Sequence, residues 1–353
     1  MKPKQTVSPR KMCCMALTLL SAVLFQNCGG DLKLEDMLPD SSGQVNEIYV
    51  FCENTVWNDT VGRYVQEKLE ERSMNLPQPE KRFTVYQFQP EGMNKARLTH
   101  RNIIEIVINQ RNENKEARLV RKGSRWAKNQ LMFEFKGQQK DELLVVLRSE
   151  LPAILDEISK KEIERHHVKF RERPNGSAQK KLNETLDMKV YIPKKLVVQK
   201  RVNDPTGSFM WLEAKGASPG GGSVLHQGVF VYTYPYVDDS TFSTSYLISK
   251  RDSVLKDNVP GSRDDQYLKT LLIEGKHPSA KEINFNGNYA IELRGEYTMH
   301  NGFMGGPFVS VTTFDETRNR IVTIEGYCYA PQLKKRDFLK EMESVVYSLS
   351  FSE

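Results

Sequence analysis

The sequence predicts a mixed α+β and α/β protein with two sheet-plus-helix sandwich domains, the second built on a mainly antiparallel sheet. Strand-like runs alternate with helical patterns in the first half of the chain, whereas strand-like runs follow one another in the second half. The polar stretch 171–181 (RERPNGSAQKK) has the composition of a linker between the halves. A length of 353 residues suits two domains, which we expect at 45–172 and 182–353.

An export signal is expected at residues 1–27. The apolar run 12–25 is too short to remain in a bilayer as a spanning helix, and no acidic residue precedes Asp31. Four basic residues come before or at the start of the run, namely Lys2, Lys4, Arg10 and Lys11. The run ends in LFQNCGG, where Cys28 occupies the position at which bacterial lipoproteins are lipidated. We therefore expect a tri-acyl anchor, palmitate included, at Cys28 after cleavage; ordinary cleavage or an uncleaved anchor are the alternatives.

The positive charge of the whole chain belongs largely to this signal. Removing its four basic residues from 51 leaves 47 basic against 45 acidic side chains, a balance of +2 in place of +6. That balance gives no reason to expect a nucleic-acid partner. Residues 28–44 mix Gly, Ser, Pro and acids without apolar periodicity, as in a flexible tether. We expect an exported protein, lipid-anchored in the cell envelope at the outer membrane, which faces either the periplasm or the surface.

The first half divides into elements by its apolar periodicity. The expected elements are strands at 47–52, 83–88, 101–109 and 130–135 and helices at 58–69 and 140–169. The first helix has Asn58 or Asp59 as its N-cap. The near-continuous apolar run in 101–109 is typical of a central strand covered on both faces. Pro152 should kink or restart the long final helix.

The second half has more strands than helices. The expected elements are strands at 188–192, 196–202, 209–214, 228–236, 268–274, 288–299, 307–314 and 321–329, and helices at 241–255 and 335–347. A short helix covering Leu182 and Leu186 follows the linker. Side chains alternate along a strand, so one face of 228–236 carries four aromatic residues, Phe230, Tyr232, Tyr234 and Tyr236. Valines on the opposite face favour a buried strand, and an exposed ladder that stacks on sugar rings is the alternative.

The sequence gives little support to metal or cofactor chemistry. Beyond the signal and Cys28 the chain has only Cys52 and Cys328, either as two buried free thiols or as an interdomain disulfide. Adjacent helical side chains point about 100° apart, so His166 and His167 cannot chelate one ion as an i, i+4 pair does. We expect a solvated helix end there. No metal site and no cofactor is expected.

Two further segments could contact a ligand. Residues 111–128 hold seven basic side chains against two acidic ones, with Trp126 close by. A solvated hairpin is the simpler interpretation, and contact with an anionic glycan or lipopolysaccharide is the alternative. Trp57 follows the first strand, where ligands of open α/β sheets tend to bind, although a hydrophobic plug is the commoner role for a tryptophan.

Several motifs together resemble an uncharacterised lipoprotein family of Bacteroidetes. Besides the lipoprotein start and the Trp57 loop, they are Leu76-Pro77-Gln78-Pro79-Glu80, Arg101-Asn102-Ile103-Ile104, Trp126-Ala127 with Gln130, Met304-Gly305-Gly306-Pro307-Phe308, Glu325-Gly326-Tyr327 with Tyr329-Ala330-Pro331, and Lys335-Arg336-Asp337. The resemblance covers nearly the whole mature chain and implies an envelope address without a known activity. The order of elements in the second half is also loosely similar to the PsbP-like fold, an architecture of binding and assembly factors.

A binding site in the first half is expected at the mouth of the central strand. Arg101 and Asn102 stand there, near the expected position of Trp126. The residues that we expect to bind a ligand are Trp57, Arg101, Asn102, Trp126 and Gln130.

The sequence favours a non-enzymatic binding or assembly module for a protein partner or an envelope glycan, held at the membrane by its lipid. The alternative is an envelope hydrolase that acts on a glycan or peptide polymer with carboxylates such as Asp238, Asp239 or Glu325. No catalytic residue is assigned, because these carboxylates form no recognisable motif. Convergent carboxylates in a cleft would favour the enzyme, and an exposed apolar or aromatic patch would favour the binder.

Overall fold

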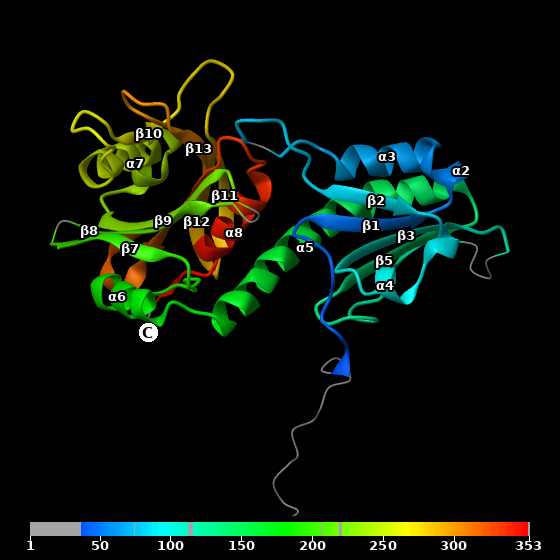
Figure 1. Cartoon of the computed structure of the whole chain (residues 1–353). Helices are drawn as coiled ribbons and strands as arrows, with labels where there is room; N and C mark the ends of the chain where they lie inside the picture. Colours follow the sequence, from blue (N-terminus) through cyan, green and yellow to red (C-terminus); the bar gives the residue numbers. More distant parts are fainter. Residues whose placement is uncertain (1–36, 74, 112–115, 206, 219–220, 352–353) are drawn as a thin grey trace, which may run out of the picture.

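The computed structural model describes residues 37–73, 75–111, 116–205, 207–218 and 221–351. The expected signal sequence, Cys28 and the first part of the expected tether lie outside these residues. The described chain forms two halves, each a sheet covered by helices, and one long helix joins them (Figure 1). The mixed α+β class predicted from the sequence is confirmed.

The N-terminal half is built on a five-stranded sheet with the order β2-β1-β3-β5-β4. Its strands are β1 (Glu47–Cys52), β2 (Thr84–Phe88), β3 (Asn102–Ile108), β4 (Arg118–Arg121) and β5 (Leu131–Gly137). The strands β2, β1, β3 and β5 run parallel, and β4 closes one edge antiparallel. The helices are α2 (Asn54–Trp57), α3 (Thr60–Leu69), η2 (Pro90–Gly92), α4 (Lys95–Leu98) and α5 (Lys140–Glu172).

Both faces of the central strand are buried, as its apolar run predicted. Ile104 packs with α3 and α5 on one face, and Ile103 packs on the opposite face with Phe51 and Met132. This alternation places the β-branched residues of β3 against two separate apolar layers.

Helix α5 runs without a break through Pro152, so the expected restart is wrong. Proline removes one backbone donor and frees the carbonyl of Arg148, but Arg148 is exposed and solvent can satisfy that oxygen. Leu151, Ile154 and Leu155 are buried on either side of the proline and hold the helix against the sheet. Packing therefore outweighs the local penalty of the proline.

The expected linker is mostly helical. After α5 only three residues precede α6 (Gly176–Leu186), whose Asn175 cap accepts a hydrogen bond from the backbone N–H of Ala178. Ala178, Leu182 and Leu186 are buried in the core of the second half. The stretch is polar because α6 faces solvent on its other side, which composition alone cannot distinguish from a linker.

The C-terminal half is built on an eight-stranded, antiparallel sheet with the order β10-β12-β13-β14-β9-β8-β7, and β11 also pairs with β12. Its strands are β7 (Val197–Asp204), β8 (Gly207–Ala217), β9 (Val224–Pro235), β10 (Leu268–Thr270), β11 (Ser279–Phe285), β12 (Asn288–Met299), β13 (Gly305–Asp315) and β14 (Arg320–Tyr329). A separate pair joins β6 (Met188–Lys189) to β15 (Ser350–Phe351). The helices are η3 (Asp239–Phe242), α7 (Thr244–Asn258), η4 (Glu316–Arg318) and α8 (Arg336–Val346).

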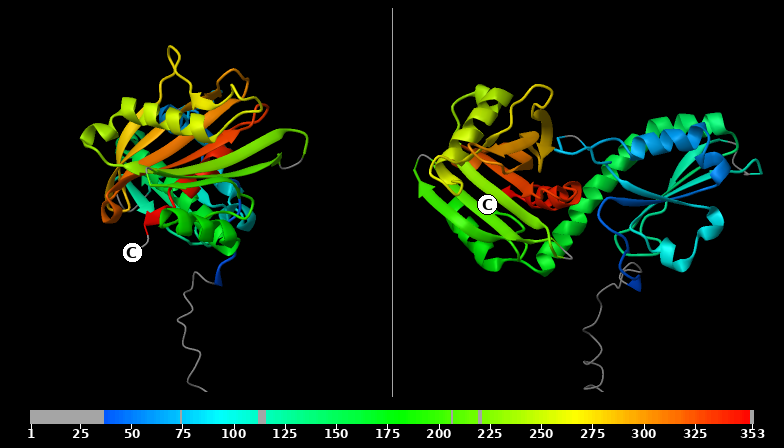
Figure 2. Two further views of the ribbon diagram at one scale, coloured as in Figure 1. Left: turned by 90° about the vertical axis from the view of Figure 1, so that its left-hand side faces the viewer. Right: turned by 45° about the horizontal axis from the view of Figure 1, so that its top comes forward.

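Helices cover both faces of this sheet. Leu247 and Leu255 of α7 pack on one face with Phe230, Tyr232 and Tyr234, so the aromatic ladder is core, as expected. On the other face, α6 and α8 cover a second apolar cluster. Figure 2 shows α7 and α8 on opposite sides of the curled sheet.

Several strands of the structure differ in length from the expected ones or were not expected. The strand at 188–192 shortens to β6 and that at 268–274 to β10, and β11 was not expected. Most side chains of β11 are exposed, so its sequence lacks the apolar alternation on which the prediction depended. Cys52 and Cys328 are both buried and free, which decides between the two alternatives.

The helix end at His166 and His167 is packed and not solvated, which corrects the expectation. His166 Nδ1 lies 2.9 Å from Ser344 Oγ, and His167 Nε2 donates to the carbonyl of Ser344 at 2.7 Å. Burial lowers the pKa of His166 to about 4. Helix α5 therefore docks on α8 of the other half.

The last part of the expected flexible tether is also ordered. Asp40 and Ser42 form backbone bridges with Lys128 and His100, and the N–H of Arg101 donates to the carbonyl of Ser42. The segment from 37 to 44 therefore lies along the N-terminal half. Among the described helices none is long and apolar enough to cross a membrane.

Candidate functional site

The structure brings four of the predicted binding residues together at the start of β3 and β5. Arg101 and Asn102 both bond the buried carboxylate of Glu162 at 2.8 Å. Gln130 donates to the carbonyl of His100 at 2.7 Å and accepts from the backbone N–H of Trp126 at 3.0 Å. Cys28, the predicted lipidation site, lies outside the described residues.

These four residues hold the N-terminal half together. Arg165 completes the cluster by donating to Asn102 Oδ1 at 2.9 Å and to Glu162 at 2.8 Å. Burial lowers the pKa of Arg165 to about 10, against the opposing effect of Glu162. Arg101, Asn102 and Gln130 are buried, and only Trp126 exposes much of its side chain. Ligand binding by this group stays a prediction.

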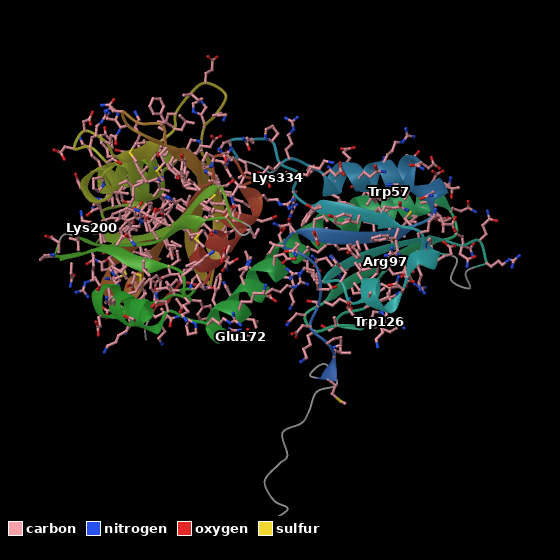
Figure 3. All side chains as sticks on the ribbon, viewed as in Figure 1. Trp57, Arg97, Trp126, Glu172, Lys200 and Lys334 are labelled. Carbon is pink, nitrogen blue, oxygen red and sulfur yellow. The ribbon has the colours of Figure 1, made fainter. Side chains whose placement is uncertain are left out.

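Trp57 does not join them. It follows the carboxyl end of β1, whereas Arg101 and Asn102 stand at the amino end of β3, and parallel strands put these ends at opposite edges of the sheet. Figure 3 shows Trp57 and Trp126 well apart, above and below the strands of this half. Trp57 is half-buried and packs against the core of the N-terminal half, as a plug does.

The described part of the basic segment 111–128 contains the edge strand β4, and several of its cations form ion pairs. Arg121 lies 3.1 Å from Glu157, and Lys122 lies 3.1 Å from Glu105 and 3.2 Å from Glu134. These pairs tie β4 to the sheet and to α5. They leave this segment less free to bind an anion than its composition suggests.

The three carboxylates considered for a hydrolase do not converge. Arg251 donates to both oxygens of Glu325 at 2.7 Å, and burial raises the pKa of Glu325 against the effect of this guanidinium. Asp238 caps η3, and Asp239 accepts from Tyr236. Asp238 follows the end of β9 that pairs with Arg320, five residues along β14 from Glu325. No group of three or more His, Cys, Asp or Glu side chains in the described chain could hold a metal ion.

A cleft of about 420 Å³ opens instead in the C-terminal half. It lies where β8 and β14 end and β9 begins, beside the turn between β12 and β13 and the segment that follows α7. The turn and that segment stand on the same side of the sheet in Figure 1. The side chains that line the cleft include Trp211, Glu213, Lys215, His226, Met299, Phe303, Met304 and Tyr327.

Three strands build the floor of this cleft in one row. Glu213 of β8 and Tyr327 of β14 both pair with Gly228 of the intervening β9. A Cβ at Gly228 would lie 2.4 Å from the Tyr327 ring and hydroxyl, so only glycine lets the tyrosine cross β9. The Tyr327 hydroxyl then donates to Glu213 Oε1 at 2.8 Å.

Tyr327 also accepts a hydrogen bond from Trp211 Nε1 at 2.9 Å. Burial, and then the charge of Glu213, raise the pKa of Tyr327 well above 10. The phenol therefore stays protonated and keeps donating to the carboxylate. Indole, phenol and carboxylate form a fixed chain, which orients two aromatic rings before any ligand arrives.

Glu213 is a buried residue in the lining of the cleft and forms an ion pair with Lys215. Its side chain is 2 % exposed, and Oε2 accepts no hydrogen bond from the described part of the protein, although Lys215 Nζ lies 3.1 Å away. His226 Nδ1 lies 3.9 Å from Oε1. Lys215 and His226 therefore flank a buried carboxylate beside an open cleft.

Apolar side chains form the rim. Phe303 is fully exposed at the tip of the β12–β13 turn, between half-buried Met299 and Met304. Val259 and Leu268 are buried and close the wall below. An exposed phenylalanine on a turn between two methionines is an adaptable apolar contact surface.

Comparison with protein-family models divides the chain into two matched parts. Residues 41–171 match a domain of unknown function, DUF8532, and residues 175–348 match a second one, DUF4837. Each half of the chain therefore contains a domain of unknown function. No curated protein matches the sequence. The Bacteroidetes origin and the PsbP-like similarity stay predictions.

The cleft lies within the DUF4837 domain, whereas every binding residue predicted from the sequence belongs to the DUF8532 domain. Tyr327 and Met304 belong to two of the motifs that carry the family resemblance, but those motifs do not indicate a cleft. The alternation of Trp211, Glu213 and Lys215 on one strand face was an available signal. Their meeting with Tyr327 depends on strand order, which the sequence does not give.

Proposed function

We propose that this protein is an exported, lipid-anchored envelope protein whose DUF4837 domain binds a partner in the Glu213 cleft without catalysis. The observation that carries the proposal is the hydrogen-bonded chain from Trp211 through Tyr327 to Glu213, which is fixed before binding. A preorganised site loses little conformational freedom when a ligand enters, and this favours binding.

The composition of the cleft favours a segment of a protein partner. Phe303, Met299 and Met304 offer an apolar rim, where an aliphatic or aromatic side chain would anchor. Stacking of a sugar ring on Trp211 is less favoured, because Lys215 Nζ lies over the face of that ring, 5.6 Å from its centre, where the sugar would have to lie.

The cleft is less suited to hydrolysis of a glycan. Glycosidases generally use two carboxylates on either side of the scissile bond. Among the described residues that line the cleft, Glu213 is the only carboxylate, and its Oε1 is engaged by Tyr327. Such an arrangement supports recognition in preference to general acid and base catalysis.

Covalent crosslinking in intact cells, followed by mass spectrometry, tests the binding proposal. Phe303→Ser removes the exposed anchor, and Val197→Ser, half exposed on β7, is the matched control. We expect a reproducible partner protein with the wild-type chain and with the control, and at least about tenfold lower recovery with Phe303→Ser. Equal recovery from all three chains, or turnover of an envelope polymer by purified protein, would contradict the proposal.

The anchor is tested separately. We expect Cys28→Ala to move the protein from the membrane fraction to the soluble fraction, because acyl chains supply the membrane affinity. Retention of Cys28→Ala in detergent-free membranes would contradict the lipid anchor and leave the cleft proposal untouched.

A further inference from the structure

A second cleft, also of about 420 Å³, lies between the two domains. The DUF8532 domain contributes Arg72 and Arg82 to its lining, and the DUF4837 domain contributes Lys281, Arg294, Arg336 and Lys340. We propose that this cleft binds a phosphate group, as a free anion or as part of a phosphorylated envelope molecule. The proposal is independent of the Glu213 cleft.

The charges of the cleft are not balanced. Six basic side chains line it against three carboxylates. Asp156 pairs with Arg82 at 2.6 Å, and Glu343 pairs with both Arg294 at 2.6 Å and Lys340 at 2.8 Å. The third carboxylate, Glu71, pairs with Lys68 outside the cleft. Arg336 pairs with Asp337 at 2.7 Å, so two of the six cations, Arg72 and Lys281, are left without an ion pair among the described residues. A multiply charged anion would neutralise both better than a carboxylate.

Arg72 and Lys281 are the two cations available to a ligand. Both are exposed, and neither forms an ion pair with any described residue. One comes from each domain. Asn75 Nδ2 donates to Ser279 Oγ at 2.6 Å across the same boundary, which holds the two segments that carry them close together.

The remaining cations are held in place behind them. Arg336 donates to Asp337 at 2.7 and 3.0 Å and to the Thr84 hydroxyl at 3.2 Å. Arg294 is held by Glu292 and Glu343, and burial of Glu343 is outweighed by Arg294 and Lys340, so its pKa falls to about 2. Because each of these cations is paired with a carboxylate, the unpaired positive charge of the cleft lies on Arg72 and Lys281.

The anion is expected to be attached to a less polar group. Leu76 and Leu339 also line the cleft, one from each domain. A guanidinium group from one domain and an ammonium group from the other suit phosphate, because arginine offers a fork of donors and lysine a compact charge. A phosphorylated lipid headgroup and a free phosphate present this same chemistry.

Binding of pyrophosphate to the mature chain, residues 28–353, tests the proposal by calorimetry at constant ionic strength. We expect saturable binding with the wild type and at least about tenfold weaker binding with Arg72→Gln/Lys281→Gln. Lys181→Gln, an exposed lysine on α6, should bind as the wild type does. Both altered residues are exposed, so the double variant should unfold at the wild-type temperature, and this is measured in the same preparation.

Vesicles of phosphatidylcholine with and without phosphatidic acid distinguish the source of the phosphate. If the protein cosediments with vesicles only when they contain phosphatidic acid and when Arg72 and Lys281 are both present, the ligand is a lipid headgroup. If the protein binds pyrophosphate but does not cosediment with either kind of vesicle, the ligand is a soluble phosphate. Equal pyrophosphate binding by the wild type and the double variant, or no saturable binding by the wild type, would overturn the proposal.

Discussion

The Glu80 carboxylate accepts a hydrogen bond from the backbone N–H of Lys335 at 2.6 Å, although 255 residues separate them. It also accepts from the N–H of Arg336 at 3.2 Å. A residue of the DUF8532 domain therefore caps α8 of the DUF4837 domain, which has no side-chain cap of its own. Local stability of that helix depends on the contact between domains.

Loss of this cap should destabilise the whole protein. Glu80 is 7 % exposed, and Glu80→Ala leaves two helical N–H groups unsatisfied, so we expect unfolding to need about 1–2 kcal/mol less free energy. Urea unfolding followed by circular dichroism measures the change. Glu172→Ala, an exposed glutamate at the end of α5, is the control and should change stability by less than about 0.5 kcal/mol. Equal stability of the two variants would show that the cap is dispensable.

Stability should fall as the pH drops from 6.5 towards 4. Burial holds the pKa of His166 at about 4 in the folded state, below its ordinary value of 6.5. Between pH 6.5 and 4, His166 binds a proton in the unfolded chain but not in the folded chain. The free energy of unfolding therefore falls over this range, by at most about 3 kcal/mol, and the fall is complete only near pH 4. Urea unfolding at a series of pH values follows the loss.

His166→Gln should reduce this acid sensitivity without removing it. The pKa values of His100 and His167 are also lowered by burial, so these residues contribute in the same direction. Glutamine keeps a donor for Ser344 but does not titrate. A variant with the same loss between pH 6.5 and 4 as the wild type would be inconsistent with a buried, neutral His166.

The buried cluster around Glu162 should be sensitive to charge. Glu162 is fully buried and pairs with Arg101 and Arg165 at 2.8 Å each. Glu162→Gln leaves two buried guanidinium groups without a counter-charge, so we expect the free energy of unfolding to fall by about 3–5 kcal/mol. Thermal unfolding measures this loss of stability. The exposed pair Glu164 and Lys161 supplies the control, since Glu164→Gln should cost less than about 1 kcal/mol.

Gly228→Ala should disturb the Glu213 cleft directly. The new methyl group would lie 2.4 Å from Tyr327, so the ring must move away from Glu213, at a cost of about 1–3 kcal/mol. Gly216→Ala on the neighbouring strand has nothing within 4 Å and should leave stability unchanged. Tyrosine and tryptophan near-ultraviolet circular dichroism should change only in Gly228→Ala. A spectrum unchanged from the wild type would contradict the crossing of Tyr327 over β9.

Most of the fold could be predicted because its signals are local. The expected strands at 47–52 and 101–109 match β1 and β3 closely, since each is an apolar run with clear boundaries. The expected strand at 288–299 matches β12. The errors fall where a local rule was overruled by packing. Pro152 lies inside α5, and the polar stretch 171–181 is largely α6. The sequence around Pro152 and the sequence of 171–181 do not show which parts of the protein pack against these segments.

The candidate site was less accessible to prediction. Trp211, Glu213 and Tyr327 are brought together by the strand order β8-β9-β14, in which residues more than a hundred positions apart become neighbours. The predicted residues Arg101, Asn102, Trp126 and Gln130 did meet, but through internal hydrogen bonds. Polar residues at a strand end predict a cluster without showing whether its bonds point inward or toward a ligand.

The sequence by itself determined the mixed fold class and most strand and helix positions, and it predicts the export signal. These features can be predicted because the order of charges and the apolar period depend only on neighbours along the chain. Only the tertiary structure decided that Glu80 caps α8, that His166 is buried, and that Gly228 leaves room for Tyr327 to reach Glu213. These relationships depend on distances through space between segments that are remote in sequence. A composition or a period carries no information about such distances.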